Sequence, residues 1–169
     1  MLAIILIMTG VFFRFIPHMP NINPVAAIAL FGAAYLPNKR LALIVPLALM
    51  ILSDLFLGLH DIVIFTWGSV VLISLIGLSL KRSKKITNIL AGSLISSLVF
   101  FIVTNFGVWA SGWYPLTLSG LSTCYIAGIP FFRNFLASTL VYSAALFGAY
   151  ELSAKFIRNT KFAAVLLTR

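Results

Sequence analysis

Three charged side chains, Arg14, Asp54 and Arg133, lie within or at the edge of strongly apolar segments. An isolated charge in a hydrocarbon environment costs roughly 3 kcal/mol or more, so charges of this kind mark pairs or functional sites. An Asp54–Arg133 ion pair would offset the cost of burying both groups, although a buried pair can also be purely structural. Two arginines against one aspartate leave a positive surplus. We expect that surplus to help hold a ligand with an anionic or strongly polar group.

Further polar and aromatic residues lie near the ends of the apolar segments, as these charges do. Asn105 is near the end of one apolar segment, and Asn134 directly follows Arg133. Residues 107–125 carry no charge, and their aromatic side chains could form an interfacial belt or the wall of a pocket. Nineteen uncharged residues are more than a simple connection needs, which favours the pocket. The candidate substrate-binding residues are Arg14, His18, Asp54, Asn105, Trp109, Trp113, Tyr114, Arg133 and Asn134.

The same region offers little support for catalysis or for a bound metal. His18, His60 and Asp61 match no metal-ligand spacing, so no metal and no cofactor is expected. The single cysteine, Cys124, excludes an internal disulfide and is expected to be an inert small residue. Coordination of a metal-containing ligand such as a cobalamin is its alternative role. No nucleophile and base are paired at a recognisable spacing, so an enzyme is not expected.

The segments that must position these residues are those of a membrane protein. The chain is 62% hydrophobic and 9% charged, whereas a soluble domain carries about 25% charged residues. Apolar segments cover residues 1–16, 25–36, 41–59, 62–80, 86–106 and 126–150. A spanning helix needs about 20 residues, so the first two are short spans or a broken hairpin inside the bundle. We predict an all-α integral membrane protein in which residues 1–169 form one domain of six transmembrane helices, the first two short or irregular.

Lys and Arg occur in alternate gaps between these segments. They cluster at residues 39–40, 81–85 and 155–169. Because cytoplasmic loops of membrane proteins retain Lys and Arg, the pattern places both termini in the cytoplasm and the candidate binding residues outside. The net charge of +9 does not indicate nucleic-acid binding, since the basic residues form short collars beside apolar spans. Their expected partners are anionic lipid headgroups or an acidic surface of a cytoplasmic protein.

Small residues form one face of the second apolar segment, at Ala26, Ala29 and Ala33. Faces of this kind let membrane helices approach closely. The face could pack within the bundle, or it could dock onto another membrane subunit.

Four stretches resemble a known but uncharacterised family of small bacterial membrane proteins that are described as transport proteins. They are residues 14–34, which begin Arg-Phe-Ile-Pro-His-Met-Pro-Asn, residues 52–58 (Leu-Ser-Asp-Leu-Phe-Leu-Gly), residues 104–109 (Thr-Asn-Phe-Gly-Val-Trp), and residues 120–134. More remotely, the layout resembles the substrate-binding (S) components of energy-coupling-factor vitamin transporters. That resemblance implies a six-helix bundle that binds a vitamin at its outer face. It also implies a coupling membrane subunit with ATPases, which the S component contacts through an alanine-rich face of its first helix rather than its second.

The expected function is therefore capture of a small polar nutrient, a vitamin or its precursor, for uptake across the bacterial inner (plasma) membrane. No nucleotide-binding motif occurs in the chain, so transport would need partner proteins. The alternative is a non-catalytic structural or assembly subunit of a membrane complex.

Overall fold

The computed structural model describes residues 1–16 and 21–167, and the chain in these ranges is helical without strands. The helices are α1 (Leu2–Arg14), α2 (Val25–Tyr35), α3 (Lys39–Leu57), α4 (Val63–Ser79), α5 (Ile86–Ala110), α6 (Leu118–Ile157) and α7 (Ala163–Leu166). The all-α prediction is confirmed for these residues, and the six apolar segments correspond to α1 through α6.

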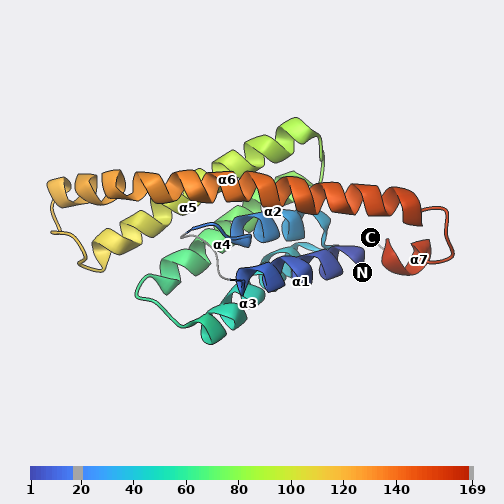
Figure 1. The fold of residues 1–169 in the computed structure, drawn as a ribbon, viewed down its shortest axis with the longest axis horizontal. Helices are drawn as coiled ribbons and strands as arrows, with labels where there is room; N and C mark the ends of the chain where they lie inside the picture. The colour runs from blue at the N-terminus through green and yellow to red at the C-terminus, as the bar shows by residue number, and fades with distance from the viewer. Residues whose placement is uncertain (17–20, 168–169) are drawn as a thin grey trace.

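The helices differ widely in length (Figure 1). Three of the described helices, α3, α5 and α6, are long and apolar enough to cross a membrane, whereas α1, α2 and α4 are shorter. At 1.5 Å per residue, the 40 residues of α6 extend about 60 Å.

The connection between α5 and α6 is much shorter than the sequence indicated. We predicted a connection over residues 107–125, but α5 continues to Ala110 and α6 already begins at Leu118. The hydroxyl of Thr117 accepts a hydrogen bond from the Gly120 N–H at 3.1 Å, which caps the start of α6. Helix propagation from this cap leaves only residues 111–117 outside the helices.

Helix α2 forms the centre of the bundle. Ten of its eleven residues are buried, and it packs against α1, α3, α4, α5 and α6. Ala26, Ala29 and Ala33 are all 0% exposed. On α4, a Cβ at Gly77 would lie 2.6 Å from the Leu30 carbonyl oxygen and 2.7 Å from the Ala33 Cβ. The small-residue face therefore packs within this chain, and the interpretation as a docking face for another subunit is wrong.

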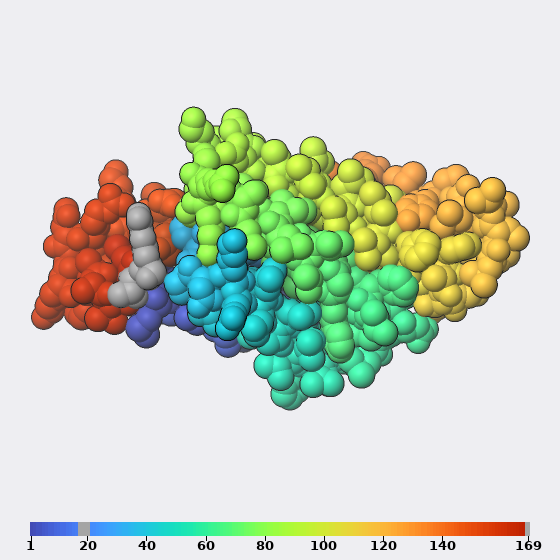
Figure 2. Space-filling model, turned by 180° about the vertical axis from the view of Figure 1, so that it is seen from behind, coloured from blue at the N-terminus to red at the C-terminus, as the bar shows by residue number. Residues whose placement is uncertain are grey.

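The connections gather at two opposite ends of the molecule (Figures 1 and 2). At one end, the Lys81 ammonium donates to the Leu36 carbonyl at 2.7 Å, and the Tyr35 hydroxyl donates to Glu151 of α6. We call this the basic end, because residues 39–40, 81–85 and 155–161 lie there. Partial burial, with smaller contributions from Lys84 and Lys39, lowers the pKa of Lys81 below its ordinary value.

The opposite end contains the C-terminus of α1, the turn between α3 and α4, and the connection between α5 and α6. We call it the pocket end.

Candidate functional site

A cavity of about 650 Å³ opens at the pocket end. Helices α1 to α6 all contribute to its wall, together with the connections that join them. Its polar lining consists of Arg14, Asn21, Asn23, His60, Asp61, Thr66, Thr104 and Asn105. Its aromatic lining consists of Phe100, Phe101, Trp113, Tyr114, Phe131, Phe132 and Phe135.

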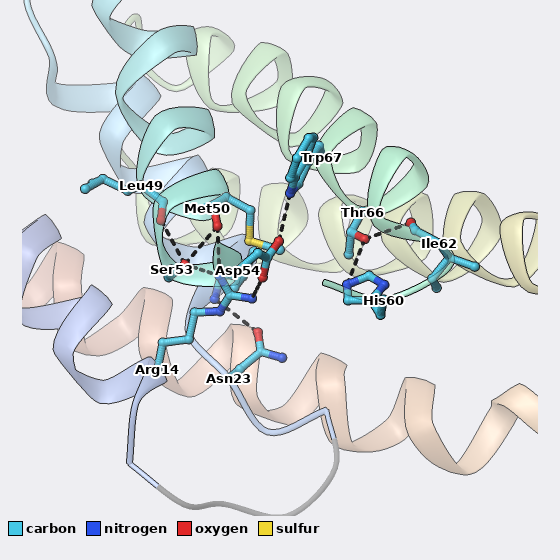
Figure 3. Close-up of polar contacts among 11 residues, drawn as sticks. Arg14, Asn23, Leu49, Met50, Ser53, Asp54, His60, Ile62, Thr66 and Trp67 are labelled. Carbon is cyan, nitrogen blue, oxygen red and sulfur yellow. Dashed lines mark hydrogen bonds and ion pairs between the residues drawn. The ribbon is translucent and has the colours of Figure 1, made fainter. Parts of the chain in front are cut away.

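A buried charge cluster lies beside this cavity, where its members Arg14 and Met50 are lining residues. Figure 3 shows the polar contacts of the cluster. Arg14, the last residue of α1, forms an ion pair with Asp54. It also donates to the hydroxyl of Ser53 and, at 3.3 Å, to the carbonyl of Met50. From α4, the Trp67 indole N–H donates to the second Asp54 oxygen at 2.7 Å. The cluster ties three helices together, and both oxygens of its carboxylate are engaged.

The expected ion pair between Asp54 and Arg133 is wrong. Asp54 is only 1% exposed, and its partner is Arg14. Arg133 is exposed on α6 and is not among the described residues that line the cavity. The Asp54 carboxylate lies in the last turns of α3, where the end of α1 and the first half of α4 pack against it.

This pairing changes the electrostatics of the site. Arg14 is offset by Asp54 at hydrogen-bond distance, and the second arginine does not line the cavity. The positive surplus that we expected from two arginines and one aspartate is therefore not found at the cavity. Asp61, at the exposed mouth, is the other formally charged residue among the described lining residues.

The long wall of the cavity is built by α5 and α6. Phe100 stacks on Phe135 with ring centroids 4.1 Å apart, and Phe101 packs against Phe132 at 4.9 Å. The Asn105 amide donates to the Phe101 carbonyl at 2.8 Å. Gly128 of α6 makes room for Asn105, since a Cβ there would collide with the Asn105 side chain.

The α5–α6 connection brings two aromatic rings to the mouth. Trp113 and Tyr114 line the cavity, and Gly112 precedes them with a φ of 83°, a conformation that favours glycine. The Trp109 indole N–H donates to the Pro115 carbonyl at 3.0 Å. Trp109 is not among the described lining residues, and its bond to Pro115 fastens the connection.

The connection between α1 and α2 supplies two asparagines. Asn21 has a φ of 61°, which asparagine tolerates better than most residues. The Ser138 hydroxyl of α6 donates to the Asn23 carbonyl at 3.1 Å, and the Asn23 side chain accepts from the Val25 N–H at 3.2 Å. These bonds fasten the connection beside the start of α2. The candidate His18 lies outside the described residues.

The structure thus brings together only part of the predicted site. Arg14, Asn105, Trp113 and Tyr114 line the cavity, and Asp54 lies directly behind Arg14. Arg133 and Asn134 lie on α6 and are not among the lining residues. Cys124 is buried, and its thiol donates to the Asn105 carbonyl at 3.3 Å.

Sequence reasoning missed most of the wall. It did not select Asn21, Asn23, Thr66, Thr104 or the five phenylalanines. A signal was present: Phe101, Asn105 and Val108 share one face of a helix by their spacing, as do Gly128, Phe131 and Phe135.

Comparison with known proteins identifies a family but no activity for it. A model described as a family of unknown function (DUF6580) matches residues 1–163. No curated protein and no solved structure matches the chain.

Proposed function

The chain belongs to the DUF6580 family of unknown function, and we propose that it is a membrane protein that captures a small molecule at the extracytoplasmic face for uptake. The cavity at the pocket end is the observation that carries this proposal. Its volume of about 650 Å³ is typical of pockets for small organic ligands.

The proposed topology is a six-helix bundle in the bacterial inner membrane with both termini in the cytoplasm. It is supported by the collection of Lys and Arg at the basic end, which is the cytoplasmic end under the positive-inside rule. The cavity then faces outside. Helix α2 is enclosed by the other helices, so its eleven residues need not match the bilayer thickness.

The lining favours binding over catalysis. Aromatic rings supply contact area, and a few polar groups supply orientation, which is the usual composition of a binding pocket. Asp54 is the most buried carboxylate of the described chain, and both of its oxygens already accept hydrogen bonds. A group held in this way is poorly placed to act as a base.

Uptake would require partners that supply energy. We propose an S-component-like role, in which a coupling membrane subunit with ATPases acts on the loaded protein. Because Ala26, Ala29 and Ala33 are buried, such a subunit would contact other helix faces.

A thermal-stability screen of the purified protein tests the proposal. We expect at least one member of a library of vitamins and related metabolites to raise the melting temperature. A ligand at 100 times its dissociation constant adds about 2.7 kcal/mol of stability, which such a screen detects.

Two matched variants locate the binding. Val108 lines the cavity, whereas Ile102 on the same helix is 47% exposed and is not a lining residue. Val108→Trp should place a bulky side chain in the cavity and remove the ligand-induced shift, and Ile102→Trp should retain it. Stabilisation that both variants retain, or a library without any stabilising compound, would contradict capture in this cavity. The second result would favour a structural or assembly subunit.

A further inference from the structure

We infer that the cavity takes an organic cation with a flat apolar body, an inference that rests on the proposed function and names its ligand class. The charge balance of the lining and the density of aromatic rings carry it.

The charge balance of the site does not suit an anion. The Arg14 guanidinium already forms an ion pair with Asp54 and donates hydrogen bonds to Ser53 and the Met50 carbonyl. Asp61 lines the mouth, and the structure shows no ion pair for it among residues 1–16 and 21–167. Because Asp54 behind the wall already neutralises Arg14, the three groups Arg14, Asp54 and Asp61 together carry one net negative charge.

The remaining basic residues are remote from the cavity. Apart from Arg133, which is exposed on α6, the described Lys and Arg residues outside the cluster belong to the basic end. An anion at the mouth would meet Asp61 without a compensating cation, whereas a cation would be attracted.

The walls also suit a cation. Seven of the twenty described lining residues are aromatic, and the face of an aromatic ring attracts a cation most strongly where water is excluded. Trp113 and Tyr114 belong to the α5–α6 connection at the mouth of the cavity. Phe100, Phe101 and Phe132 line its walls on α5 and α6.

A flat apolar body could lie against these rings. Phe100 and Phe135 are already stacked with their planes 17° apart, and Phe101 and Phe132 pack beside them. Rings that line a cavity offer offset-stacked or edge contacts to a planar group beside them. Thr66, Thr104 and Asn105 supply the polar atoms that would orient it.

Three probes of similar size but different charge test the inference on the purified full-length chain. They are 1-methylquinolinium (cation), 1-methyl-2-quinolone (neutral) and quinoline-4-carboxylate (anion). Dissociation constants are measured by thermal shift and by calorimetry at low ionic strength. We expect the cation to bind about tenfold more tightly than the neutral probe, the size of one favourable cation–π or charge contact, and the anion to bind most weakly.

Two charge-removing variants distinguish the effect of a charge at the mouth of the cavity from the effect of a charge far away. Asp61 is exposed, so Asp61→Asn should fold normally. It should lower the affinity for the cation several-fold and leave the neutral probe unchanged. Glu151→Gln removes a charge at the basic end, where Glu151 accepts from Tyr35, and should change neither affinity.

The outcomes distinguish the ligand class from the proposed function. A preference for the neutral or the anionic probe, abolished by Val108→Trp, overturns the cation and leaves capture in the cavity standing. A cation preference that Asp61→Asn does not reduce also overturns the ligand class. Failure of all three probes to bind at millimolar concentration overturns the ligand class, and the metabolite screen then decides capture on its own.

Discussion

At the scale of single residues, the Arg14–Asp54 cluster shows how this chain accommodates charges in an apolar environment. The Arg14 and Asp54 side chains are 13% and 2% exposed, and Ser53, Trp67 and the Met50 carbonyl complete their hydrogen bonds. A buried ion pair with these additional bonds is tolerated, whereas one member left alone is strongly unfavourable.

Removal of one partner should therefore destabilise the protein. We expect Asp54→Ala to lower the free energy of unfolding by about 3–5 kcal/mol, because Arg14 would remain buried without its counter-charge. Denaturation of the purified protein in detergent measures the change.

The double variant provides the control for this prediction. Arg14→Met combined with Asp54→Ala removes both charges, and its cost should be clearly smaller than the sum of the two single changes. Additive costs would show that the two residues stabilise the fold independently.

At the scale of elements, α2 is a short helix that is buried on every side. Its sequence contains no charged side chain, and its alanines and glycine let neighbouring helices approach closely. The contact with α4 at Gly77 is the tightest of these approaches, since an added Cβ would meet both backbone and side chain of α2.

Two glycines of α4 give a matched test of this packing. Gly77→Ala should destabilise the protein by about 1–3 kcal/mol, the usual cost of overpacking a core. Gly68 has no atom within 4 Å of an added Cβ, so Gly68→Ala should be neutral or stabilise by up to about 1 kcal/mol through helix propensity. Equal effects in thermal denaturation would contradict the close approach of α2 and α4.

The elements were easier to predict from the sequence than the site. Apolar segments and their basic flanks locate α1 to α6 because helix length and hydrophobicity are local properties. The partner of Asp54 is a tertiary property. Arg14 and Arg133 both lie at the right depth, and only the packing of α1 against α3 selects Arg14.

The predicted boundaries of α5 and α6 were wrong for a related reason. The start of α6 at Leu118 depends on one side-chain cap at Thr117 within a stretch of glycine, proline and aromatic residues. The composition of that stretch indicates a connection, yet its first residues belong to the end of α5 and its last residues to the start of α6.

At the scale of the whole molecule, charge and cavity lie at opposite ends. Of the described residues, the Lys and Arg of the three clusters lie at the basic end, and the lining residues of the cavity lie at the other. This asymmetry is the basis of the orientation that we propose.

Labelling of intact cells tests that orientation. In a Cys124→Ser background, Ser111→Cys should react with a membrane-impermeant maleimide from outside, since Ser111 lies in the exposed α5–α6 connection. Asn159→Cys, after α6 at the basic end, should react only after permeabilisation. The reverse pattern would place the cavity in the cytoplasm.

The length of α6 has a mechanical consequence. One continuous helix carries Phe132 and Phe135 at the cavity and Glu151 and Lys155 at the basic end, so it is longer than the about 30 Å of bilayer hydrocarbon. Phe147 packs edge-on against Phe31 of α2 at 5.3 Å between these two ends. A ligand that displaced the cavity end of α6 would therefore also move its basic end, because one helix joins the two. Occupancy of the cavity would thus become a displacement at the opposite end of the molecule.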